Sequence, residues 1–141
     1  MKKKSLFSLF LLFSLPLIAG GDIQVKLAND YFLRNNYKEA FYWYNEAVKE
    51  GNVESLYNIG ACYFNGYGVA QNYQEALLWY HKAADKEYVL AQFMIAFCYY
   101  KGYGVKQNLK QAVQWYQKAA ERGLPAAQMS LAGCYYTGDG V

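Results

Sequence analysis

The chain has 141 residues, and 16 Tyr, 8 Phe and 3 Trp among them provide ample material for a core. Its 14 basic residues exceed its 11 acidic residues by three, but three of the lysines stand at positions 2–4. From residue 22 onward, 11 basic residues balance 11 acidic ones. This balance excludes a basic stripe that would neutralise phosphates, so we expect no nucleic-acid partner.

Residues 1–21 have the pattern of a bacterial signal peptide. Three lysines precede an apolar run from Leu6 to Ile18, and Ala19-Gly20-Gly21 offers small residues for cleavage before Asp22. The run is shorter than the roughly 20 apolar residues that span a bilayer. We therefore expect a periplasmic or secreted protein with no membrane contact after cleavage; an uncleaved anchor is the alternative. No Cys follows the run to suggest a lipoprotein.

A period of 36 residues runs through the rest of the chain. Gly-Tyr-Gly-Val occurs at 66–69 and 102–105, and Gly-Asp-Gly-Val occurs at 138–141. The same spacing relates Cys62, Cys98 and Cys134, and it relates Trp43, Trp79 and Trp115. Such periods indicate stacked units that bury apolar surface for one another. What recurs is mostly scaffold, and function must be sought in what differs between units.

Each unit has the pattern of two helices. Leu56, Ile59, Gly60 and Tyr63 form one stripe of a first helix, which Gly66 ends by supplying a left-handed cap. The second helix buries a stripe of Ala76, Tyr80, Ala83 and Ala84 and has Asn72 as its N-cap. We expect an all-α fold without strands, with helices near 22–34, 37–50, 53–65, 73–86, 89–101, 109–121 and 125–137.

Two stretches resemble the Sel-1-like repeat of the tetratricopeptide-like superfamily. They are Asn58-Ile-Gly-Ala-Cys-Tyr-Phe-Asn-Gly-Tyr-Gly-Val69 and Ala76-Leu-Leu-Trp-Tyr-His-Lys-Ala-Ala84, and the next unit repeats them. Residues 28–40 lack the Gly-x-Gly-Val insertion and look like a tetratricopeptide repeat. The resemblance implies a right-handed α-solenoid with units at 22–52, 53–88, 89–124 and a partial unit at 125–141.

The partial unit leaves three alternatives open. Its first helix has no second helix after it, so Leu131 and Tyr135 lack the cover that their counterparts have. Either the natural chain is longer, or this end frays, or it pairs with another chain. The oligomeric state is therefore left open.

The three cysteines are expected to be reduced and buried beside the core tyrosines. Helix pairs stack about 10 Å apart, whereas a disulfide needs Cα atoms within about 7 Å. Members of the family that staple each helix pair carry a pair of cysteines per repeat, and this chain carries one. No close pair of metal ligands such as Cys-x-x-Cys is present, so we expect no metal or other cofactor.

Enzymatic activity is not expected. The single histidine, His81, lies in a variable position of the second helix and is interpreted as a solvated surface residue. Some members of the family are described as penicillin-binding or β-lactamase-like, which makes a cell-wall-directed enzyme the alternative function. The nucleophile motif Ser-x-x-Lys is absent: Ser55 is followed by Leu-Tyr-Asn and Ser130 by Leu-Ala-Gly.

The first helices carry an apolar and aromatic face that we call the aromatic groove. In the tetratricopeptide superfamily this face is concave and binds partner segments, so the resemblance implies a non-enzymatic scaffold for a protein or peptide partner. The alternative is that these rings only pack against neighbouring first helices. The expected groove residues are Tyr57, Phe64, Leu90, Phe93, Phe97, Tyr100, Lys101, Met129 and Tyr136, with Ala61, Asn65, Gly133 and Thr137 on the same face.

Overall fold

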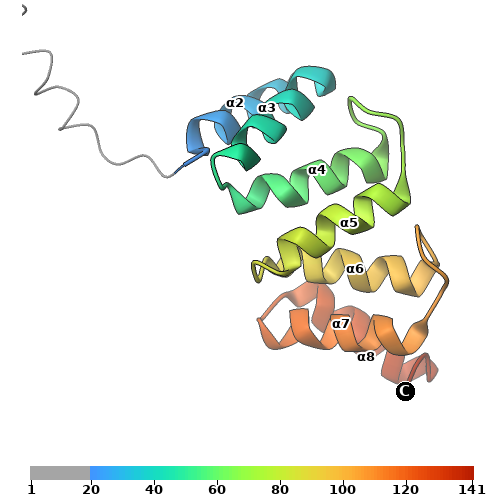
Figure 1. Ribbon diagram of the computed structural model, residues 1–141. Helices are drawn as coiled ribbons and strands as arrows, with labels where there is room; N and C mark the ends of the chain where they lie inside the picture. The colour runs from blue at the N-terminus through green and yellow to red at the C-terminus, as the bar shows by residue number, and fades with distance from the viewer. Residues whose placement is uncertain (1–19) are drawn as a thin grey trace, which may run out of the picture.

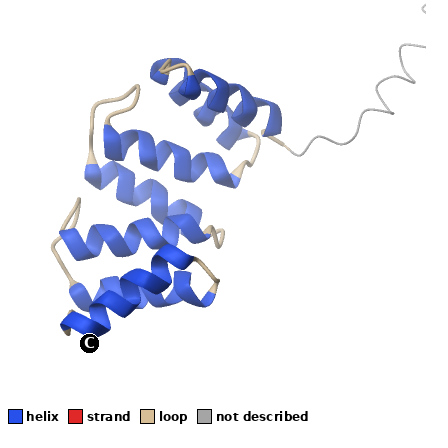
Figure 2. Cartoon of the chain, turned by 180° about the vertical axis from the view of Figure 1, so that it is seen from behind, coloured by secondary structure: helices blue, strands red, loops and turns tan. Residues whose placement is uncertain are grey.

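Every regular element that the computed structural model describes, within residues 20–141, is an α-helix (Figure 2). Each helix begins where the sequence predicted and ends within two residues of the predicted position. The all-α class is therefore confirmed. The helices are α2 (Asp22–Leu33), α3 (Tyr37–Lys49), α4 (Val53–Asn65), α5 (Tyr73–Ala84), α6 (Val89–Lys101), α7 (Leu109–Glu121) and α8 (Pro125–Thr137).

The predicted signal segment falls almost wholly on residues 1–19, outside the described residues. From residue 20 onward, no helix combines the length and the hydropathy that crossing a bilayer requires.

The helices form pairs that stack into a solenoid (Figure 1). Pairs form between α2 and α3, between α4 and α5, and between α6 and α7. The second helix of each pair also packs against the first helix of the next pair, and α8 packs in this way on α7. The long loops that follow α4 and α6 lie on the same side of the stack (Figures 1 and 2).

Each Gly-Tyr-Gly turn ends a first helix and touches the preceding unit. Gly102 ends α6 at φ 75°, and its N–H donates to the Cys98 carbonyl at 2.8 Å. Gly104 has φ 70°, and a Cβ placed there would overlap the carbonyl oxygen of Tyr73, the first residue of α5. Only glycine permits both the left-handed backbone and so close an approach. The turn of one unit is thus seated on the start of the second helix before it.

The tyrosine of the turn strengthens the same contact. The Tyr103 ring stacks on the Tyr73 ring with centroids 4.6 Å apart, and Tyr67 stacks on Tyr37 at the same separation. Such aromatic pairs contribute about 0.5–1.5 kcal/mol beyond the area that they bury. The period of 36 residues therefore records a contact between units as well as the internal structure of each unit.

Small residues and buried tyrosines form the core between the helices. Around α5 and α6, Tyr80, Ile95 and Cys98 are fully buried, and alanines fill the places where the helices approach most closely. Trp115 of α7 packs partly buried on this cluster, and Trp79 packs likewise on the cluster before it. Both tryptophans therefore pack on the preceding unit and are only partly exposed.

The end of α5 differs from the prediction by two residues, because the chain turns at Glu87. This residue has φ 61°, whereas Gly51 and Gly123 occupy the equivalent positions with φ 86°. Its N–H donates to the Ala84 carbonyl at 2.8 Å, and its carboxylate pairs with Arg122 at 2.7 Å. The helix thus ends at Ala84 even though no glycine marks the turn.

The contact between units predicts a large difference between two glycine substitutions. Gly104→Ala combines a left-handed backbone with overlap on Tyr73, so we expect it to lower the free energy of unfolding by about 3 kcal/mol. Gly123→Ala is the matched control, because its φ is 86° and no atom lies within 4 Å of an added Cβ. It should cost only the left-handed backbone term, about 1 kcal/mol. Urea denaturation followed by circular dichroism measures both, and equal losses would contradict the seated turn.

Candidate functional site

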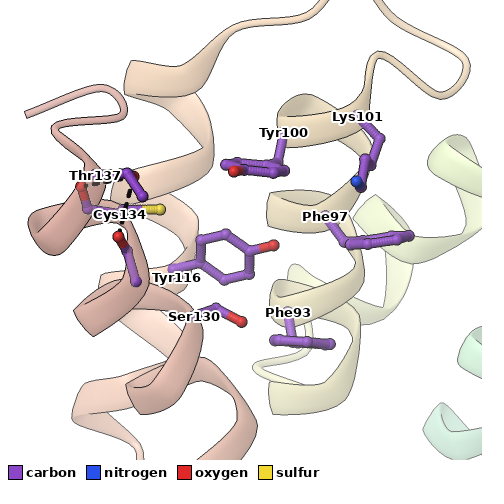
Figure 3. Close-up of a pocket in the computed structure, with 9 residues that line it drawn as sticks. Phe93, Phe97, Tyr100, Lys101, Tyr116, Ser130, Cys134 and Thr137 are labelled. Carbon is purple, nitrogen blue, oxygen red and sulfur yellow. Dashed lines mark hydrogen bonds between the residues drawn. The ribbon is translucent and has the colours of Figure 1, made fainter.

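The structure gathers four of the nine expected groove residues around one pocket between α6 and α8 (Figure 3). Its volume is about 360 Å³. We call it the α6–α8 pocket. Helix α6 provides one wall, α8 the facing wall, and the Tyr116 ring of α7 lies between them (Figure 3). The lining residues are Phe93, Phe97, Tyr100, Lys101, Tyr116, Ser130, Gly133, Cys134 and Thr137.

Two expected groove residues lie on α4 and are occupied by packing. The Tyr57 ring lies 5.7 Å from the Tyr80 ring and 5.4 Å from the Tyr88 ring. The Phe64 ring meets that of Tyr73 edge-on at 5.0 Å. Both side chains are half-buried against the cluster around α5 and α6, and neither lines the pocket.

Three other groove residues are exposed outside the pocket. Leu90, at the start of α6, is 39% exposed. Met129 and Tyr136 on α8 are 76% and 93% exposed. They widen the apolar surface of α8 but do not line the pocket.

Three lining residues were not among the groove residues expected from the sequence. Tyr116 is the counterpart, 36 residues later, of Tyr80 in the expected buried stripe, and it is only 3% exposed. Its ring reaches the pocket because the facing position on α8 is Gly133, which has no side chain to cover it. Ser130 lies about one turn of α8 before this glycine, and Cys134 follows it directly. The sequence does contain a signal for these three residues, because Gly133 stands where the other units carry Ala61 and Phe97 and so leaves its neighbours uncovered.

The pocket is walled by aromatic rings that hold one another in place. Phe93 lies 5.6 Å from Tyr116, and Tyr100 lies 6.5 Å from it, measured between ring centroids. The Tyr100 hydroxyl donates to Asp139 Oδ2 at 2.9 Å, which ties α6 to the turn after α8. Phe93 and Tyr100 are therefore held against Tyr116 by contacts within the protein, without a ligand.

The ionisable groups of the pocket are not arranged for nucleophilic chemistry. Burial raises the pKa of Tyr116 to about 12, and burial also raises the pKa of the Cys134 thiol. A raised pKa keeps the thiol protonated at neutral pH, whereas a reactive cysteine needs a lowered one. Within residues 20–141, no cluster of three or more His, Cys, Asp or Glu side chains has a geometry that would hold a metal ion. An apolar pocket with a few polar groups is typical of binding.

His81 corrects an expectation from the sequence, because it is not a fully solvated residue. Its ring is half-buried and meets the Trp115 ring edge-on, with centroids 5.5 Å apart. Burial lowers the pKa of His81, against the opposing effect of Asp85. The cause is that Trp115 packs backward onto the preceding unit, which the sequence did not indicate.

The comparisons with known proteins identify the family. The Sel1 repeat model matches residues 27–52, 53–88, 89–124 and 125–141. The chain therefore belongs to the Sel1 repeat family, whose members are typically protein-interaction modules. A comparison with curated proteins gave no match.

Solved structures of Sel1 repeat proteins superpose on the chain. One is c5321, a protective antigen of uropathogenic Escherichia coli, with 35% identity and a TM-score of 0.82 over 87% of this chain. A Sel1 repeat protein of Oxalobacter formigenes has 30% identity and a TM-score of 0.81 over 94% of this chain. Cysteine-rich protein B of Helicobacter pylori has 26% identity and a TM-score of 0.61 over 67% of this chain. The chain spans 27%, 56% and 71% of these proteins, respectively, so it matches only part of each.

The burial of the cysteines leads to a prediction about their reactivity. Cys62 and Cys98 are at most 1% exposed, and burial raises the pKa of each thiol to about 12. We expect all three cysteines to be reduced, and iodoacetamide to modify Cys62 and Cys98 only after denaturation. Mass spectrometry after alkylation without reductant measures this. A cysteine peptide pair lighter by two hydrogens, or rapid labelling of Cys98 in the folded protein, would contradict it.

Two neighbouring residues of α6 separate the pocket wall from the core. Ile95 is fully buried, so Ile95→Ala should lower the free energy of unfolding by about 2–5 kcal/mol. Phe97 is half-buried and packs 5.8 Å from Tyr103 and 6.3 Å from Phe64. Phe97→Ala should therefore cost less, about 2 kcal/mol, from the partial burial of its side chain and from these ring contacts. Chemical denaturation compares the two variants, and an equal loss would place Phe97 in the core.

Proposed function

We propose that this protein is an exported, non-enzymatic scaffold that binds a segment of another protein in the α6–α8 pocket. The observation that carries the proposal is the pocket itself, which is open to solvent and walled by four aromatic side chains. Aromatic side chains are enriched at the centres of protein interfaces, where burying one contributes most to affinity. The proposal that the protein is exported, to the periplasm or beyond, rests on the signal pattern of residues 1–21.

The supporting physical argument is that apolar core side chains are left uncovered at the pocket. Phe93, Tyr100, Tyr116 and Cys134 pack in one cluster around α7, and all four also line the pocket. Exposed apolar patches are commonly sites of interaction. Membership of the Sel1 repeat family supports a protein as the partner.

A test of this function compares two exposed faces of the same protein. Crosslinked partners would be isolated from the cell envelope of the source organism with the wild type, with Phe97→Ala and with Gln114→Ala. Gln114 is an exposed residue of the second helix α7 and does not line the pocket. We expect Phe97→Ala to lower the yield of the partner about tenfold or more, since removal of a central interface aromatic often costs 2 kcal/mol or more. Equal losses from both variants would contradict binding in the pocket.

The alternative, a β-lactamase-like or penicillin-binding activity, has no support among the described residues. Ser130 lines the pocket, but Leu131, Ala132 and Gly133 follow it where a serine enzyme would place Lys at the third position. We therefore expect no covalent adduct and no hydrolysis when the protein is incubated with a fluorescent penicillin, with a serine β-lactamase as the positive control. Gel fluorescence and intact mass measure this. A stoichiometric adduct would establish the enzyme instead.

A further inference from the structure

The α6–α8 pocket exists because α8 carries smaller side chains than its counterpart one unit earlier. A shift of 36 residues relates Met94 to Ser130, Phe97 to Gly133, and Lys101 to Thr137. All three residues of the later unit line the pocket, and each is shorter than its counterpart. A Cβ built on Gly133 meets no atom within 4 Å, so this position faces open space.

The equivalent space between α4 and α6 shows what fills it. There the Phe97 ring lies 6.3 Å from the Phe64 ring and 5.8 Å from the Tyr103 ring. One unit later, Tyr100 takes the place of Phe64 and Asp139 takes the place of Tyr103, but Gly133 supplies no ring between them. The remaining walls are present, because Phe93 and Tyr100 each still pack on Tyr116. The space therefore keeps most of the aromatic surroundings of a phenylalanine side chain, with Asp139 in place of one ring, but lacks the side chain itself.

The charge at the pocket indicates what accompanies this ring. Lys101 is the one charged residue in the lining, and its Nζ lies 5.6 Å from the centroid of the Tyr100 ring. Within residues 20–141, it forms no ion pair with a carboxylate. The nearby carboxylate of Asp139 is already bound by the Tyr100 hydroxyl. A negative charge beside the incoming ring would complement Lys101.

From these observations we propose that the α6–α8 pocket binds a peptide segment with an aromatic side chain next to an acidic one. The aromatic ring takes the place that Phe97 takes one unit earlier, between Tyr100 and Gly133. The carboxylate of the neighbouring Asp or Glu pairs with Lys101 at the rim. This inference rests on the proposed function and specifies the chemistry of the partner.

The proposal is tested by selecting random dodecapeptides on phage against the purified protein, with Gly133→Phe as the counter-target. In Gly133→Phe the protein's own phenyl ring fills the pocket. Selected peptides should therefore bind this variant at least about tenfold more weakly than they bind the wild type. Gly133→Ala adds a methyl group in open space and is the matched control that should keep binding. If Gly133→Phe does not fold, as judged by circular dichroism, Ser130→Met replaces it, because Met94 is the natural counterpart.

We expect the selected peptides to share an aromatic residue adjacent to Asp or Glu. Lys101→Gln should weaken them about three- to fivefold and remove most of the salt dependence, as for an exposed ion pair. Peptides that bind Gly133→Phe as well as the wild type, or that lack the aromatic residue, would overturn the inference and leave peptide binding by the scaffold intact. Peptides that carry the aromatic residue but bind Lys101→Gln as well as the wild type would overturn the pairing of a peptide carboxylate with Lys101. Recovery of no peptide would contradict the proposed function as well.

Discussion

The contact between each Gly-Tyr-Gly turn and the start of the preceding second helix sets the spacing of the whole array. Gly68 and Gly104 approach the carbonyl oxygens of Tyr37 and Tyr73 too closely for any side chain to fit, and Gly140 meets Leu109 in the same way. With this distance set by backbone against backbone, the helices of successive units are held at a constant separation. The alanines, buried tyrosines and cysteines of the helices then fill a space whose dimensions recur. Most of the recurring residues are explained by this single constraint.

Because the spacing between helices is constant, a small side chain at a position where other units carry a larger one leaves a cavity. If α6 and α8 were free to approach each other, the space beside Gly133 would close, because interiors pack densely. The turn after α8 instead stays seated on Leu109 and is bound to Tyr100 through Asp139, so the helices keep their distance. The pocket is therefore a consequence of one unit departing from the repeat while the contacts that space the units are retained. The same reasoning places function in the differences between units.

The sequence was sufficient for the fold because the fold is local and periodic. Asn72 caps α5 through the Glu75 N–H at 3.1 Å, and Gly102 ends α6, as their residue types indicated. The site was predicted less well, because burial on the first helices depends on rings from other segments. Tyr57 and Phe64 are covered by Tyr88 and Tyr73, which belong to turns and second helices, and no periodicity within α4 shows this. The half-burial of His81 under Trp115 depends on a contact between units and was missed for the same reason.

Hydrogen exchange of the protein, with and without a saturating bound peptide, tests most directly whether the peptide binds where α8 differs from the other first helices. Amide exchange reports which helices lose opening motions when a ligand is bound. The account predicts slower exchange confined to the three helices that line the pocket, at residues 89–101, 109–121 and 125–137, with α3 and α5 unchanged. Protection confined to the second helices, or spread evenly over all units, would contradict it.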